Sequence, residues 1–225
     1  MSENQDRPQT TKSNGEIIEF ITQRVKVLPD EQIAAREARI EAARVDTVAA
    51  TLRESWQAPR RHVETAVDRS GPWGARLLEI ESAIMAGKIW ALIGTRGNGK
   101  TQLAVEAMRT WTSKGRSARY ATAVEMFVDI KATYRKDSTE SEAHVIARYR
   151  KPRLLVIDEM SKRAETDWEN TILFEILNKR YGDKTDTILI ANLAPADFAK
   201  NIDLSIARRL NETGGAIVCD WPVKF

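Results

Sequence analysis

The stretch that decides the fold is an apolar run that leads directly into a glycine-rich turn, Ile89-Trp90-Ala91-Leu92-Ile93-Gly94-Thr95-Arg96-Gly97-Asn98-Gly99-Lys100-Thr101. The turn meets in full the pattern of glycine, four residues, glycine, lysine and a hydroxyl residue. Its glycines allow backbone N–H groups to turn inward around an anion, and a helix predicted over 101–114 adds the positive end of its dipole. The stretch therefore predicts a buried strand, a phosphate-binding loop and a helix.

The chemistry of this loop indicates ATP or another nucleoside triphosphate, bound together with Mg²⁺. Lys100 would bridge the β- and γ-phosphates, and the Thr101 hydroxyl would ligate the metal ion. We expect the whole loop to bind the nucleotide, through Gly94, Thr95, Arg96, Gly97, Asn98, Gly99, Lys100 and Thr101.

Two further strands are predicted to end in polar residues that face the same ligand. The apolar run 154–157 is followed by Asp158 and Glu159. Asp158 would hold Mg²⁺ through water, and Glu159 would act as the general base on the attacking water, unless the acidic pair only caps the next helix. Asn192 follows the run 187–191 and would contact the γ-phosphate or the lytic water, or cap a turn.

The segments around these motifs alternate between strand-like and helix-like patterns. Further strands are predicted at 119–122 and 216–219, and further helices at 123–135 and 168–181. Such alternation predicts an α/β fold with a mostly parallel sheet and helices on both faces.

Composition excludes several classes of protein. The 225 residues carry 35 Lys and Arg against 32 Asp and Glu, a formal charge of +3, which permits a nucleic-acid partner without requiring one. Cys219 is the only cysteine and His62 and His144 are the only histidines, which excludes an intrachain disulfide and argues against a structural zinc site. No apolar run approaches the roughly 18 residues of a membrane helix. We expect a soluble, cytoplasmic protein with no membrane association.

The part before residue 73 has a different character. We expect a disordered tail at 1–15, a helical partner-binding region with a linker at 16–72, and the nucleotide-binding domain at 73–225. The predicted helix runs from Pro29 to Gln57, and residues 60–72 form the linker. One face of this helix carries an apolar stripe, either for packing or for docking another protein, made of Val45, Val48, Leu52 and Trp56.

With three motifs in this order, the chain resembles the AAA+ ATPases, and within them the DnaC/DnaI-type helicase loaders and the IstB-type transposition helper ATPases. The residues that carry the resemblance are Gly99 to Ala104, Leu154 to Glu159, Asn178 to Tyr181, Asn192-Leu193 and Ala207 to Leu210. The resemblance implies a five-stranded core with the 187–191 strand between the P-loop strand and the acidic strand. It also implies self-association into an open or helical oligomer on single-stranded DNA. From the sequence itself we expect an N-terminal helical extension and no C-terminal lid domain after the last strand.

The resemblance assigns an arginine finger as well. Arg209 matches the residue that reaches the γ-phosphate of the neighbouring subunit, and a one-residue slip would exchange it with Arg208. Fingers of this type raise hydrolysis rates by about 10³–10⁵. Arg180 also matches a family position, where it would serve packing or an intersubunit salt bridge.

The stretch from Lys131 to Arg153 is the candidate DNA-binding surface, because basic side chains and tyrosines suit a channel that follows phosphates and stacks bases. Solvated helix faces would explain the same pattern. Its members are Lys131, Tyr134, Arg135, Lys136, Arg148, Tyr149, Arg150, Lys151 and Arg153.

These features favour an ATP-hydrolysing loader that binds single-stranded DNA and grips a replicative helicase through its N-terminal region. The alternative is an IstB-like ATPase that assembles on duplex DNA and recruits a transposase. A third class is a regulatory nucleotide-binding module with little turnover. The groups that hold the base are left open, since Trp73 and Trp90 near the loop are better explained by packing.

Overall fold

A computed structural model describes residues 30–221, and within that range the side chains of all residues except 30, 33, 44–49 and 51–53. The chain divides into two compact units, Met1–Ala43 and Arg44–Phe225, and the second contains the sheet. Helix α2, Asp30–Glu54, crosses this division. The predicted disordered tail at 1–15 lies outside the described residues.

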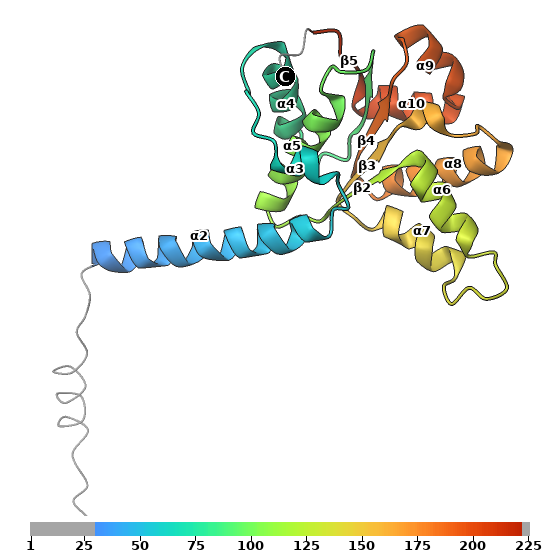
Figure 1. Cartoon of the computed structure of the whole chain (residues 1–225). Helices are drawn as coiled ribbons and strands as arrows, with labels where there is room; N and C mark the ends of the chain where they lie inside the picture. The colour runs from blue at the N-terminus through green and yellow to red at the C-terminus, as the bar shows by residue number, and fades with distance from the viewer. Residues whose placement is uncertain (1–29, 222–225) are drawn as a thin grey trace, which may run out of the picture. The chain divides into compact units, whose positions relative to one another are not determined.

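The second unit is built on five parallel strands (Figure 1). They are β1 (Ile89–Ile93), β2 (Ala118–Thr122), β3 (Leu154–Asp158), β4 (Asp186–Ala191) and β5 (Gly215–Val218). Their order across the sheet is β2-β3-β4-β1-β5, and every neighbouring pair is parallel. The predicted five-stranded parallel sheet is confirmed, with β4 between the P-loop strand β1 and the acidic strand β3.

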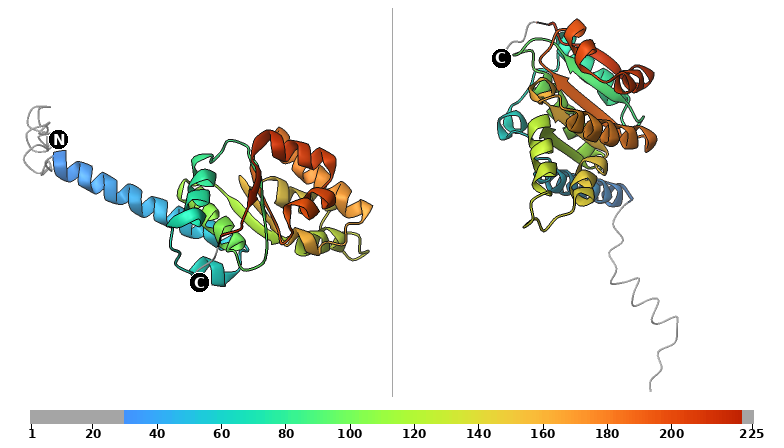
Figure 2. Two further views of the ribbon diagram at one scale, coloured as in Figure 1. Left: turned by 90° about the horizontal axis from the view of Figure 1, so that it is seen from above. Right: turned by 90° about the vertical axis from the view of Figure 1, so that its right-hand side faces the viewer.

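Helices cover both faces of this sheet, as the two views in Figure 2 show. One face is covered by α6 (Ala123–Ala132), α7 (Glu142–Arg150), the 3₁₀ turn η1 (Met160–Lys162), α8 (Asp167–Gly182), α9 (Pro195–Asn201) and α10 (Leu204–Thr213). The other face is covered by α3 (Arg60–Glu64), α4 (Gly71–Ser82) and α5 (Lys100–Ser113). None of the helices in the described range is both long enough and apolar enough to cross a membrane.

Each central strand buries side chains on both faces, because successive residues of a strand point to opposite sides. In β3, Leu155 and Ile157 join the core under α6 to α10, whereas Leu154 and Val156 join the core under α4 and α5. This explains why the strand is a continuous apolar run rather than an alternating pattern. It also leaves the ends of the strands as the places where polar side chains meet.

The segment 60–72, predicted as a linker, begins with the short helix α3 in the structure. The helix predicted from Pro29 to Gln57 ends earlier in the structure, where α2 ends at Glu54, and Pro59 is the N-cap of α3. Proline is well tolerated at a helix start because the first N–H groups have no intrahelical partner. The extent of the three sequence-defined parts stays a prediction.

Trp56 anchors the end of the N-terminal segment to the sheet. Its side chain is fully buried with the α4–α5 core, and its carbonyl accepts a hydrogen bond of 2.7 Å from the backbone N–H of Tyr120 at the edge of β2. For this residue, the packing interpretation of the apolar stripe is confirmed. The side chains of the other three stripe residues, at 45, 48 and 52, lie outside the described set.

Candidate nucleotide site

The P-loop connects the C-terminal end of β1 to the first turn of α5. Gly94, Gly97 and Gly99 all have positive φ, at 135°, 85° and 68°. At Gly94 a side chain is also excluded by space, because a Cβ atom would lie 2.5 Å from the carbonyl oxygen of Cys219. The same carbonyl accepts a hydrogen bond of 2.5 Å from Asn98 Nδ2, which ties the loop to the segment after β5.

Lys100 places its ammonium group inside this loop. Its Nζ donates to the carbonyls of Gly94 at 3.0 Å and Thr95 at 2.5 Å, and the residue is only 4% exposed. Burial lowers the pKa of Lys100 below its ordinary 10.5, while the nearby Cys219 and Asp158 oppose this shift. A buried cation in a glycine-rich loop at the start of a helix is an arrangement suited to phosphates.

Asp158 is the centre of a small hydrogen-bonded network at the end of β3. Its Oδ2 accepts from the Thr101 hydroxyl at 2.7 Å and from the Tyr120 hydroxyl at 2.8 Å. Its Oδ1 accepts from the backbone N–H of Glu159 at 2.5 Å. Burial, reinforced by Asp158, raises the pKa of Tyr120, so this phenol stays a donor to the carboxylate.

The Thr101 and Asp158 oxygens fit Mg²⁺. The two oxygens lie 2.7 Å apart at the start of α5 and the end of β3. A hydroxyl and a carboxylate are oxygen ligands of the kind that Mg²⁺ takes beside a nucleotide, directly or through a water molecule. Among the described residues there is no cluster of three metal-binding side chains.

Glu159 follows Asp158 at the carboxyl end of β3 and has an unusual backbone. Its φ of 55° and ψ of 37° are left-handed, a conformation uncommon outside glycine. Its carboxylate forms an ion pair with Lys162 Nζ at 2.5 Å, and the side chain is 34% exposed. Glu159 therefore lies next to Asp158, with its carboxylate paired to Lys162.

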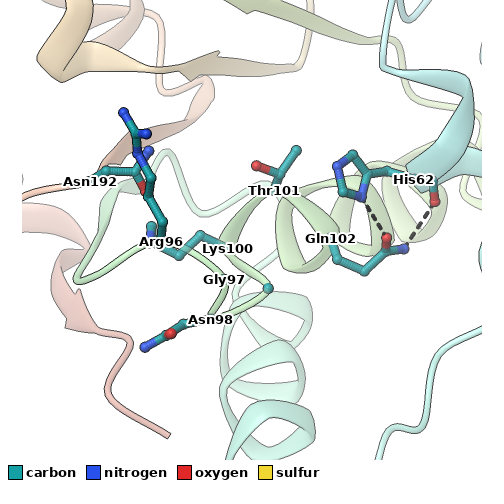
Figure 3. Close-up of a pocket in the computed structure, with 9 residues that line it drawn as sticks. His62, Arg96, Gly97, Asn98, Lys100, Thr101, Gln102 and Asn192 are labelled. Atoms are coloured by element: carbon teal, nitrogen blue, oxygen red, sulfur yellow. Dashed lines mark hydrogen bonds between the residues drawn. The ribbon is translucent and has the colours of Figure 1, made fainter. Parts of the chain in front are cut away.

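A pocket of about 210 Å³ opens over the P-loop (Figure 3). It is lined by His62, Arg96, Gly97, Asn98, Gly99, Lys100, Thr101, Gln102 and Asn192. Asn192, directly after β4, and Arg96 lie on one side of this pocket, and His62 lies on the other. The structure thus brings most of the sequence-predicted nucleotide residues and Asn192 together. Glu159 is not among the residues that line the pocket.

His62 is a site residue that sequence reasoning missed. Its Nδ1 donates to Gln102 Oε1 at 2.9 Å, and Gln102 Nε2 donates back to the His62 carbonyl at 2.9 Å. Forty positions separate the two residues, so no local pattern predicts the pair. Trp73 also reaches the loop, since its Nε1 donates to the Gly99 carbonyl at 3.2 Å, whereas Trp90 is buried in the core as predicted.

The two finger candidates lie on α10, away from this pocket. The Arg209 guanidinium donates to Asn178 Oδ1 at 2.6 Å and lies 4.9 Å from the centre of the Phe174 ring. Arg208 is directed outward, with a side chain 81% exposed, and donates to Glu212 Oε1 at 2.7 Å. Neither arginine lines the pocket of its own chain.

Arg180 serves packing. Its side chain is fully buried, and burial lowers the pKa of its guanidinium to about 9 against the opposing charges of Asp186 and Asp183. The guanidinium donates to Thr187 Oγ1 and to the carbonyls of Tyr149, Arg150, Pro152 and Asp186. It thereby holds the segment before β3 against the first two residues of β4.

The predicted DNA-binding stretch is divided between two places. Lys131 lies 4.8 Å from the Trp168 ring centre at the start of α8, and Tyr134 donates to Glu142. The basic residues at 148–153 instead surround the N-terminal end of β3. The two places adjoin, because Arg148 forms an ion pair with Glu140 and the Tyr149 hydroxyl donates to Asp129 on α6.

The fold and the site define an AAA+ protein with a P-loop nucleotide site. A family model described as "IstB-like ATP binding protein" matches residues 78–205, which is more than half of the chain. The chain therefore belongs to the IstB-like family of ATP-binding proteins, and the resemblance found in its motifs is confirmed.

Curated relatives are replicative helicase loaders. The loader DnaC of Escherichia coli strain K12 is 26% identical over 117 residues, which cover 52% of this chain and 47% of the loader. DnaC of Buchnera aphidicola subsp. Baizongia pistaciae is 27% identical over 100 residues, covering 44% of this chain and 41% of the loader. The match thus spans less than half the length of either relative.

Solved structures share the fold. A crystal structure of DnaI aligns with a TM-score of 0.59 at 17% identity, covering 73% of this chain and 95% of DnaI. The DnaC helicase loader aligns with a TM-score of 0.57 at 19% identity, covering 68% and 93%. The replication initiator DnaA bound to AMPPCP and single-stranded DNA aligns with a TM-score of 0.57 at 16% identity, covering 70% and 48%.

Proposed function

We propose that this chain is an ATP-dependent replicative helicase loader, which binds single-stranded DNA and delivers the helicase. The observation that carries the proposal is the sequence match to the DnaC loaders, joined to a P-loop site with buried Lys100 and Asp158. The cytoplasmic location expected from the sequence agrees with this role.

In this proposal the P-loop binds the triphosphate of ATP. The loop N–H groups and the Lys100 ammonium hold the phosphates, because both are positive and already ordered by the fold. Thr101 and Asp158 hold Mg²⁺, with the Tyr120 hydroxyl fixing the carboxylate from behind. When bound, Mg²⁺ neutralises charge that develops on the phosphate oxygens.

Glu159 and Asn192 act on the attacking water. Water attacks the γ-phosphorus, the bond from that phosphorus to the bridging oxygen breaks, and Glu159 accepts the proton of the water. For this role the carboxylate must leave Lys162, and that ion pair is partly exposed and weak enough to open. Asn192, which lines the pocket, would orient the water or the γ-phosphate.

Hydrolysis is proposed to require a second copy of the chain. Arg209 and Arg208 both lie away from the pocket of their own chain, so a finger from α10 would have to act on a neighbouring subunit. Such a head-to-tail contact builds open or helical assemblies unless its rotation closes a ring. ATP turnover would therefore report assembly on DNA.

The N-terminal region is proposed to bind the helicase. The described side chains of α2 are all exposed, including that of Ile40 at 59%, and so are available to a partner. The second candidate is the IstB-like role in transposition, which the family model favours. The two roles differ in the protein that is recruited.

A paired binding assay separates these two roles. The full chain with ATP and Mg²⁺ is mixed with the replicative helicase, or with a transposase, from the organism that encodes it. Co-elution from a sizing column is then measured, with Lys100→Ala as the nucleotide-free control. The loader proposal predicts a complex with the helicase alone. A complex with the transposase alone would replace it by the transposition role, and binding to neither would remove both.

ATP turnover tests the alternative of a regulatory module. Wild-type protein should hydrolyse ATP faster when single-stranded DNA is added, and Glu159→Gln should bind ATP without hydrolysing it. Equal and negligible turnover in both proteins, with and without DNA, would favour a regulatory module.

A further inference from the structure

Two basic loops lie side by side at the edge of the sheet where the strands begin. One connects α5 to β2 and contains Lys114 and Arg116, and the other connects α7 to β3 and contains Lys151. Ser117 joins the two loops. Its carbonyl accepts a hydrogen bond of 3.1 Å from the backbone N–H of Leu154, and its hydroxyl accepts one of 3.2 Å from the backbone N–H of Arg153. No acidic residue occurs in 114–119 or 148–154.

Between these loops lies a second pocket, of about 260 Å³. It is lined by Ser55, Ser117, Ala118, Arg119, Arg148, Lys151 and Pro152, so that three cations and no carboxylate face it. Arg148 forms an ion pair with Glu140 outside the pocket. Within the described part of the chain, Arg119 and Lys151 have no acidic partner in an ion pair. The pocket therefore has a net positive charge that its own walls do not neutralise.

One of the basic side chains, that of Arg119, is held in place by an aromatic ring. The guanidinium of Arg119 stacks 4.7 Å from the centre of the Tyr149 ring, and its buried Nε has no hydrogen-bond partner in the described structure. Behind the pocket, buried Arg180 binds the carbonyls of Tyr149, Arg150 and Pro152. Arg180 thus already orders the backbone beside these cations, so an anion that binds them pays less conformational entropy.

The ATP phosphates cannot occupy this pocket. The P-loop follows the C-terminal end of β1, whereas the pocket precedes the N-terminal ends of β2 and β3, and all strands are parallel. A strand of five residues is about 15 Å long. The pocket is therefore a separate site at the opposite edge of the sheet.

We propose that this pocket binds phosphate groups of a nucleic-acid backbone. The cations do not stop at its rim, since Lys114, Arg116 and Arg153 continue along the two loops. A row of cations suits a polyanion, which releases several counterions on binding, better than a single small anion. The identity of the nucleic acid as single-stranded DNA rests on the proposed loader function.

The double variant Arg119→Gln/Lys151→Gln tests this proposal. Binding of a fluorescent single-stranded oligonucleotide to the full chain with ATP and Mg²⁺ is followed by anisotropy over a series of salt concentrations. Loss of two phosphate contacts should reduce the slope of log affinity against log salt by about 1.4, since each contact to a single strand contributes about 0.7. The single variant Lys151→Glu leaves Arg119 stacked on the Tyr149 ring and should still weaken oligonucleotide binding. The control, Arg60→Gln/Lys200→Gln, removes the same charge from exposed residues elsewhere and should not.

The outcomes separate this site from the loader function. A wild-type slope retained in both pocket variants would overturn the pocket and leave DNA binding to other surfaces. Loss of slope on duplex DNA but no binding to a single strand would support the pocket and contradict the loader role. Displacement of the oligonucleotide by inorganic phosphate at constant ionic strength would indicate a small-anion site instead and overturn the proposal. Absence of binding to either form of DNA would overturn both.

Discussion

Replacing Arg180 by methionine should destabilise the ATPase domain strongly. The guanidinium donates five hydrogen bonds, four of them to backbone carbonyls, from a fully buried position. Each buried carbonyl left without a donor costs about 1–3 kcal/mol. Two of the four lie where water can partly replace the donor. The methionine variant also avoids the cost of burying a charge, which offsets part of the loss. That cost is evident in Arg180 itself, because burial lowers its pKa to about 9.

These contributions leave a net loss of about 3–5 kcal/mol, which is the range for breaking a buried charged network. In a domain of this size that corresponds to a fall in Tm of roughly 6–20 °C. Thermal unfolding followed by circular dichroism measures it, with Arg180→Lys expected to fall between wild type and Arg180→Met. The matched control is Arg208→Met, an arginine whose side chain is 81% exposed and whose loss should leave Tm almost unchanged. An Arg180→Met protein as stable as this control would refute the clamp.

Three further predictions concern the nucleotide site. Gly94→Ala should weaken ATP binding and should lower Tm by more than Gly97→Ala does. Both glycines have positive φ, but only at Gly94 would a Cβ meet a backbone carbonyl, at 2.5 Å. An equal fall in Tm for the two variants would contradict the close contact. Burial lowers the pKa of Lys100, so just below pH 10.5 this group is protonated more often in the unfolded chain than in the folded one. Its contribution to the free energy of unfolding therefore rises with pH over this range. ATP affinity should fall over the same pH range, because the phosphates need the ammonium group. The control Lys100→Arg should show an affinity that does not change with pH, and the same result for the wild-type protein would contradict the prediction. Tyr120→Phe removes one of the donors to Asp158 and should raise the Mg²⁺ concentration needed for ATP binding about tenfold or more; an unchanged Mg²⁺ titration would remove Tyr120 from the site.

The features that sequence predicts well here are those encoded over a few adjacent residues. A strand, a glycine turn and a helix follow one another at 89–113, and the acidic pair directly follows a buried strand at 154–157. Parallel strands then bring their carboxyl ends to one edge, which is why Lys100, Asp158 and Asn192 were expected near one another. The order of the strands came from resemblance, since no local pattern specifies which strands are neighbours.

The features that were missed depend on distant partners. His62 reaches the site by pairing with a glutamine 40 positions later, so its role appears only in the folded chain. Arg180 lies on the buried face of α8, one and two turns after Leu177 and Leu173, and the five acceptors that explain its packing role come from two other segments. Some signals were present and not used. Thr122 and Glu125 form a capping box at the start of α6, and the spacing Thr-x-x-Glu predicts that helix start directly.

Mixing two inactive variants tests most directly whether a neighbouring subunit completes the nucleotide site. Glu159→Gln lacks the proposed base but keeps the finger, and Arg209→Ala keeps the base but lacks the finger. Each variant alone should bind ATP, assemble, and show almost no DNA-stimulated hydrolysis. In an equal mixture about one quarter of the head-to-tail interfaces join an intact site to an intact finger.

The mixture should therefore recover about a quarter of wild-type ATP hydrolysis. Thermal unfolding of both variants, and the same mixture made with Arg208→Ala, control for folding and for the identity of the finger. A mixture of folded, ATP-binding variants that co-assemble and yet hydrolyse no faster than either alone would contradict a site shared between subunits.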